Sequence, residues 1–129
     1  MKLFLTTALL LFAGLVNAGP ATPEQIAEAA RHCDQLMRAG VIQDLYLKTF
    51  AKPNFQGPAI DDKKNVANLA CINLKKGTTI RSLQTGTYTH IVCYAGENCA
   101  GDTVYDGLGP DSDSNINTPA CRLYCGENE

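Results

Sequence analysis

The chain has 129 residues, of which 19% are charged, and its formal net charge is −2. This length fits a single domain, and a slightly acidic chain without a basic run argues against binding to nucleic acid or to an anionic membrane surface. After the N-terminal segment no apolar run approaches the roughly 18 residues of a membrane span, so we expect no membrane insertion.

The first eighteen residues are typical of a secretory signal peptide. Lys2 precedes an apolar run over residues 3–16, and small residues at Val16 and Ala18 predict cleavage after Ala18. Cleavage would leave 111 residues with ten basic and thirteen acidic side chains, a net charge of −3. We therefore expect the protein to be secreted.

All six cysteines lie beyond the predicted cleavage point: Cys33, Cys71, Cys93, Cys99, Cys121 and Cys125. An even number of cysteines after a signal peptide indicates a disulfide framework formed in an oxidising compartment. Their spacing lacks the Cys-x2-Cys knuckle of structural zinc sites, so disulfides are favoured over a metal site. The spacing does not select one connectivity among those that six cysteines allow.

A helix is predicted at the start of the secreted chain. Thr22 fits the N-cap, Pro23 the first helical position and Gln25 the partner in a capping box, and Gly40 is suited to end the helix. Apolar residues recur at helical spacing on one face: Ile26, Ala29, Ala30, Cys33, Leu36 and Met37. We expect this face to dock on the protein body, pinned by Cys33, rather than to bind a partner or a membrane.

From residue 41 onward the sequence is typical of short strands separated by polar turns. Strands are predicted over residues 44–50, 79–85, 88–94, 101–105 and 120–124. Gly86 and Thr87 predict a hairpin turn between the second and third of these strands. The charged stretches 61–64, 75–77 and 106–117 are interpreted as loops. This pattern predicts a β-sandwich or a small barrel.

An internal repeat with an offset of 44 residues carries the most information. The offset relates four pairs of residues: Phe50 and Tyr94, Asn54 and Asn98, Phe55 and Cys99, and Gly57 and Gly101. A shared offset indicates a duplicated structural unit. The repeated glycine would either adopt a positive φ or let the aromatic ring approach the backbone. Because one unit alone would bury too little surface, the two should pack face to face.

The repeated pattern aromatic-x4-aromatic-x-Gly resembles the Greek-key signature of the βγ-crystallin superfamily. Phe50, Phe55 and Gly57 match it fully, whereas the second copy has Tyr94, Cys99 and Gly101, with a cysteine at the inner aromatic position. The resemblance implies a mainly β fold in which two Greek-key motifs form a β-sandwich. The N-terminal helix would dock on that sandwich.

The resemblance also bears on calcium. Each motif of the family closes with a serine-bearing strand, and Ser82 has this position in the first motif, whereas the second has Ala120. In calcium-binding members this closing segment supplies acidic, amide and hydroxyl ligands. In the first segment Arg81 replaces the hydroxyl ligand, and in the second only Asn115 fits. A lost oxygen ligand and an added cation predict no ordered calcium site.

No catalytic residues, metal site or cofactor are predicted. Asp111-x-Asp113-x-Asn115 resembles the start of an EF-hand loop but lacks the glycine that such a loop needs, so it is interpreted as a solvated acidic loop. The carboxylate pairs 61/62 and 111/113 belong to no catalytic motif. The most enzyme-like arrangement would be a small ribonuclease that uses His90 with Glu97 and an arginine, which the acidic charge disfavours.

We divide the chain into a signal peptide (1–18), an N-terminal helix (19–40) and a crystallin-like domain (41–129). The chain most resembles small secreted cysteine-rich proteins of fungi, and the superfamily includes killer toxins and protease inhibitors. Because the chain also lacks a catalytic motif, we expect a non-enzymatic, monomeric effector or killer-toxin-like factor that binds an unidentified protein or cell-surface target. The alternatives are an inhibitor of an extracellular hydrolase and a small secreted ribonuclease or other hydrolase. Residues 54–64 and 106–118 are candidate recognition loops, because loops on a rigid scaffold often carry recognition.

Overall fold

The structure is a computed structural model that describes residues 21–41 and 44–125. The predicted signal peptide lies outside the described residues. Within the described residues, no helix has both the length and the hydropathy needed to cross a bilayer.

Helix α2 (Pro23–Arg38) forms where the sequence predicts it. The Thr22 hydroxyl accepts a hydrogen bond from the Gln25 amide, and the Gln25 side chain accepts one from the Thr22 amide. This reciprocal pair is the predicted capping box. Cys33 is buried and Met37 packs against the hydrophobic core, so the apolar face docks on the body as expected.

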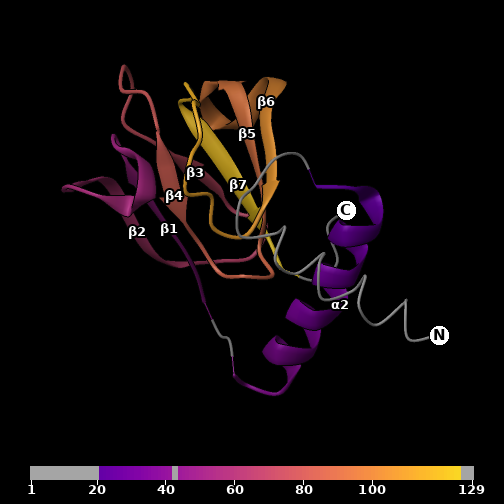
Figure 1. Ribbon diagram of the computed structural model, residues 1–129. Helices are drawn as coiled ribbons and strands as arrows, with labels where there is room; N and C mark the ends of the chain where they lie inside the picture. The colour runs from indigo at the N-terminus through magenta and orange to yellow at the C-terminus, as the bar shows by residue number, and fades with distance from the viewer. Residues whose placement is uncertain (1–20, 42–43, 126–129) are drawn as a thin grey trace.

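In the part of the chain that the structure describes, seven strands form two antiparallel sheets. The first sheet has the order β2-β1-β4, with β2 over Ala59–Val66, β1 over Leu45–Phe50 and β4 over Ser82–Gln84. The second has the order β3-β7-β5-β6, with β3 over Cys71–Asn73, β7 over Ala120–Tyr124, β5 over His90–Gly96 and β6 over Ala100–Leu108. Figure 1 shows the two sheets with helix α2 at one end of them. The mainly β architecture with one N-terminal helix is confirmed, and the Greek-key assignment stays a prediction.

The two halves of the chain exchange strands. Strand β3 belongs to the first half by sequence but pairs with β7 in the second sheet. In return, segment 111–116 of the second half joins the first sheet through bridges from Ile116 to Ile80 and from Asp111 to Leu83. Neither half therefore completes its own sheet.

The hydrophobic core lies between the two sheets. Leu47 and Leu83 come from the first sheet and Ile91 and Leu123 from the second, and each of these side chains is at most 1% exposed. Along β1 the side chains of Leu45, Leu47 and Thr49 are buried and alternate with the less buried Tyr46 and Lys48, but Phe50 at the end of the strand is buried as well.

The predicted hairpin at Gly86 and Thr87 is wrong. Strand β4 lies in the first sheet and β5 in the second, so this turn connects the sheets instead of pairing its two flanking strands. A Cβ on Gly86 would lie 2.8 Å from the Thr89 hydroxyl. The glycine therefore permits a tight connection between sheets, which local sequence does not distinguish from a hairpin.

The charged stretch 61–64 is also not a loop, because it lies within strand β2. Strand β2 is at the edge of its sheet, where charged side chains can reach solvent. The buried side chain of Asp61 points inward and accepts hydrogen bonds from the Thr49 hydroxyl (3.0 Å) and the Lys75 amide (3.1 Å). Charge alone was therefore a poor guide to the loop boundaries.

The 44-residue repeat has a structural counterpart in two short 3₁₀ turns, η1 (Pro53–Phe55) and η2 (Glu97–Cys99). The paired φ angles are 58° and 60° at Asn54 and Asn98, 59° and 57° at Phe55 and Cys99, and 80° and 85° at Gly57 and Gly101. Positive φ is thus the reason for the repeated glycine. Close approach of the aromatic ring is not the reason, because a Cβ on Gly57 would lie next to the Lys52 side chain and not next to the Phe50 ring.

The cysteines form three disulfides, Cys33–Cys125, Cys71–Cys99 and Cys93–Cys121. The first confirms that a disulfide joins the helix to the body, at Cys125 directly after strand β7. The second ties η2 to β3 through Cys99, the residue at the inner aromatic position of the repeat. The third joins facing residues of β5 and β7. Three disulfides indicate a protein that folds in an oxidising compartment.

Candidate functional site

A groove opens between an edge of the second sheet and the segment that completes the first. One wall is residues 103–106 of β6, and the other is Asp111 with residues 113–116. Its volume is about 460 Å³, within the range of about 300–1,000 Å³ that is common for ligand sites. We call this feature the edge groove. None of the Greek-key signature residues lines it.

The edge groove follows from strand geometry. Successive side chains of a strand point to opposite faces of the sheet, so a hollow on one face is lined by every second residue. The edge groove is lined by four consecutive residues, 103–106, and therefore lies along the edge of the strand. Strand β6 is the last strand of its sheet and pairs with β5 on its other side. The facing segment is held from behind, since Asp111 and Leu83 exchange backbone hydrogen bonds, as do Ile116 and Ile80.

Tyr105 and Asp111 join the two walls. The Tyr105 hydroxyl donates a 2.8 Å hydrogen bond to Asp111 Oδ2, and the other carboxylate oxygen accepts one from the Asp113 amide (3.0 Å). Burial and the neighbouring Asp111 carboxylate raise the pKa of Tyr105 far above its usual range, so the phenol stays a donor. Asp111 is only 3% exposed, which corrects the prediction of a solvated acidic loop at this residue.

Gly107 makes room for this arrangement. A Cβ at that position would overlap the phenol of Tyr105. The sequence analysis did not identify Tyr105 as part of a site, whereas Gly107 lies within the predicted recognition loop 106–118. A glycine inside a strand was the available signal, because it often marks the close approach of another group.

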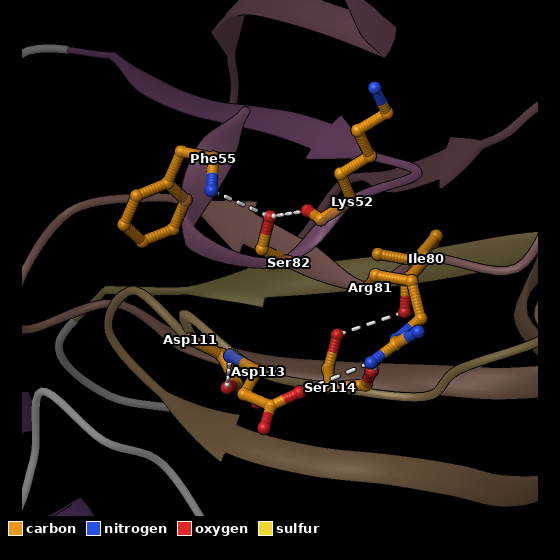
Figure 2. A network of polar contacts seen from close by, with 8 residues as sticks. All are labelled: Lys52, Phe55, Ile80, Arg81, Ser82, Asp111, Asp113 and Ser114. Carbon is orange, nitrogen blue, oxygen red and sulfur yellow. Dashed lines mark hydrogen bonds and ion pairs between the residues drawn. The ribbon is translucent and has the colours of Figure 1, made fainter. Parts of the chain in front are cut away.

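Arg81 contacts the segment that forms one wall of the edge groove, and Figure 2 shows its side chain next to Ser114 and Asp113. Its Nε donates a 2.9 Å hydrogen bond to the Ser114 carbonyl, and its Nη2 lies 3.5 Å from Asp113 Oδ1. The Ser114 hydroxyl in turn donates to the Ile80 carbonyl. The guanidinium that replaces a hydroxyl in the predicted closing segment thus binds oxygens of the facing segment. Among the described side chains no three histidine, cysteine or acidic residues gather as a metal site.

Ser82 holds the first repeated turn in place (Figure 2). Its fully buried hydroxyl donates a 2.6 Å hydrogen bond to the Lys52 carbonyl and accepts a 3.0 Å bond from the Phe55 amide. The second half has Ala120 at the matching position. There the Thr118 hydroxyl donates to the Tyr94 carbonyl at 2.6 Å instead.

His90 lies apart from the arrangement that the ribonuclease alternative requires. Its Nε2 is 2.6 Å from Asp106 Oδ1, and its ring lies 5.3 Å from the Tyr124 ring. Glu97 forms an ion pair with Lys76 instead. His90 begins strand β5 and Glu97 follows its other end, so extended strand of roughly 20 Å separates the two residues that this alternative needs together.

No family model matches the chain, and no curated protein or solved structure matches it either. The described residues define a small mainly β protein with two antiparallel sheets, one N-terminal helix and three disulfides.

Proposed function

We propose that the chain is a secreted binding protein with a βγ-crystallin-like fold, which holds a protein partner in the edge groove outside the cell. The observation that carries the proposal is the groove itself. It presents a strand edge and carboxylates on a frame that three disulfides cross-link. Rigid frames of this kind suit recognition because little conformational entropy is lost on binding.

Two observations support the crystallin-like part of the proposal. The repeated turns share positive φ angles at the same three positions of each copy. The strand exchange places β3 in the second sheet and segment 111–116 beside β4 in the first, so the two halves complete each other. The secreted location rests on the predicted signal peptide and on the disulfides.

Binding is favoured over catalysis by the state of Asp111 and Tyr105, the two polar groups that join the walls of the groove. A general acid or base must reach the substrate with a proton that it can exchange. Asp111 is almost fully buried and is occupied by two donors, and the Tyr105 proton is committed to Asp111. Both groups therefore serve to fix the two walls.

The test is a binding assay with the purified oxidised protein, labelled at its α-amino group, on intact candidate host or competitor cells. We expect saturable binding that unlabelled protein displaces and that protease treatment of the cells removes. The reduced and alkylated protein is the control and should not bind. Equal binding by that control would contradict the proposal. Stoichiometric inhibition of a secreted protease would support the inhibitor alternative instead.

A further inference from the structure

We infer that the edge groove binds an extended, basic segment of the partner, which adds as a short strand to the free edge of β6. The inference rests on the binding function proposed above and specifies the class of partner. Strand addition uses backbone hydrogen bonds for affinity and alternate side chains for specificity.

Strand β6 is the sheet edge that the fold leaves open. The edge strand β2 carries Lys63 and Lys64, and lysines are a common protection against edge pairing. The edge strand β3 has only three residues and is tied to η2 by a disulfide. The outer side of β4 is occupied by segment 111–116.

Within the described residues, strand β6 has none of these three protections: no lysines, no short length and no covering segment. It spans nine residues, contains neither lysine nor proline, and leaves Val104 46% exposed. In the part of the chain that the structure describes, β5 is its only strand neighbour. The register with β5 shifts next to Val104, and such a bulge interrupts regular pairing, so we expect an added strand of about four residues, which spans about 13 Å.

The charge of the edge groove selects a basic occupant. All of its charged lining residues are acidic, namely Asp106, Asp111 and Asp113. The Asp106 and Asp113 side chains are 49% and 76% exposed, so a lysine or arginine of the partner can reach both, although His90 and Arg81 already contact them. An exposed pair such as that of Asp113 with Arg81 is weak and can be exchanged.

The net charge of the second half of the chain also favours a basic partner segment. Residues 86–125 contain five acidic side chains and a single arginine, without lysine, whereas residues 44–85 contain seven basic and three acidic side chains. The resulting field draws a basic segment toward the second half. A second copy of the chain is a poorer occupant. Two antiparallel copies of β6 would bring Asp102 and Asp106 of one copy near the same residues of the other, and these like charges would repel.

The probe for the test is an acetylated and amidated hexapeptide of alternating lysine and valine, titrated into the oxidised ¹⁵N-labelled protein. We expect saturable amide shifts confined to β6 and segment 111–116, which weaken as salt is raised from about 0.1 to 0.5 M. A glutamate–valine hexapeptide and a lysine–valine hexapeptide with N-methylated valines should each bind at least about tenfold more weakly, because the first repels the carboxylates and the second lacks backbone donors.

The matched variants are Val104→Lys in the groove and Val41→Lys outside the sheets, both at exposed positions that add the same charge. We expect Val104→Lys to weaken peptide binding about tenfold or more and Val41→Lys to leave it unchanged. Shifts elsewhere, equal binding of the glutamate peptide or undiminished binding by Val104→Lys would overturn the inference. So would self-association of the protein alone that Val104→Lys abolishes, since the occupant would then be a second copy.

The cell assay separates this inference from the proposed function. Cell binding that survives Val104→Lys would overturn strand addition at β6 and the placement of the partner in the edge groove, while extracellular binding itself stands. Absence of cell binding by the unsubstituted protein would contradict the binding function itself, whatever the peptide does.

Discussion

At the scale of single residues, buried polar side chains fix the backbone where the two halves meet. Ser82 holds the first repeated turn, Asp61 joins β2 to β1, and Asp111 joins both walls of the edge groove. Every described buried side-chain nitrogen or oxygen has a hydrogen-bond partner. Removal of one partner leaves the other buried and unpaired, which costs more than the net value of the bond.

Ser82→Ala should lower the free energy of unfolding by about 1–3 kcal/mol, because the Lys52 carbonyl and the Phe55 amide each lose a partner. Urea denaturation followed by circular dichroism measures the change. Ser112→Ala, at a partly exposed position, is the control and should have a much smaller effect. Equal effects of the two substitutions would show that the hydroxyl of Ser82 does not hold the turn.

Ionisation of Tyr124 should make the free energy of unfolding fall at alkaline pH. Burial, and then its hydrogen bond with Tyr94, raises the pKa of Tyr124 to about 12, above the value of about 10 in an unfolded chain. The folded protein therefore keeps a proton that the unfolded chain loses, and this stabilisation is complete below pH 10 and declines as the pH rises from about 10 to 12.

The decline can be measured by urea denaturation across that pH range, and tyrosinate absorbance reports the ionisation. Tyr124→Phe should make the stability curve flatter between pH 10 and about 12 and remove one late-ionising tyrosine. The exposed Tyr46 provides the control substitution, Tyr46→Phe. An unchanged slope in Tyr124→Phe would contradict the expectation.

At the scale of elements, helix α2 is an appendage tied to the sheets at a few points. The Cys33–Cys125 disulfide anchors it, and the His32 ring stacks on the Tyr88 ring at 4.6 Å. Only Ala29 and Cys33 of the helix are buried. Because so little of the helix is buried, we expect the disulfide to hold the helix in place. The two sheets depend on this disulfide less, since they share a buried core.

Replacement of Cys33 and Cys125 together by serine should release the helix and destabilise the fold by about 4–5 kcal/mol. The disulfide closes a loop of 92 residues, against 28 for Cys71–Cys99, so the chain-entropy view predicts a loss roughly 1 kcal/mol greater than that of the matched Cys71→Ser/Cys99→Ser protein. Urea denaturation measures both, and ellipticity at the helix band should fall only in the first. A retained helix signal would show that other contacts suffice.

The elements that the sequence predicted correctly are those with local causes. The capping box around Thr22 and the strand predicted over residues 44–50, observed as β1, depend on the residues of those segments themselves. The errors have distant causes. Residues 61–64 form a strand because Thr49 and Lys75 satisfy Asp61, and β3 forms because β7 lies beside it.

At the scale of the whole molecule, the exchange of β3 and segment 111–116 makes the two halves interdependent. Each sheet contains backbone from both halves of the chain, and the core draws side chains from both sheets. Loss of one half would expose the inner face and a sheet edge of the other.

The oxidised protein should therefore unfold in one cooperative transition. Far-ultraviolet circular dichroism, which follows the sheets, and fluorescence of the five tyrosines should give coincident urea curves. Two separate transitions would contradict the interdependence of the halves. The serine double variant at Cys33 and Cys125 is the internal check, since its helix signal should be lost without a second transition in the sheets.

Features with local or compositional causes could be predicted from the residues alone: the capped helix, the duplicated turn around Gly57 and Gly101, and the presence of disulfides in a chain with an even number of cysteines. The tertiary structure alone decided the cysteine pairing, the strand exchange and the edge groove. Tyr105 and Asp111 illustrate the reason. Their hydrogen bond depends on which sheet each segment joins, and sheet pairing is set by burial over the whole chain and not by the residues next to each strand.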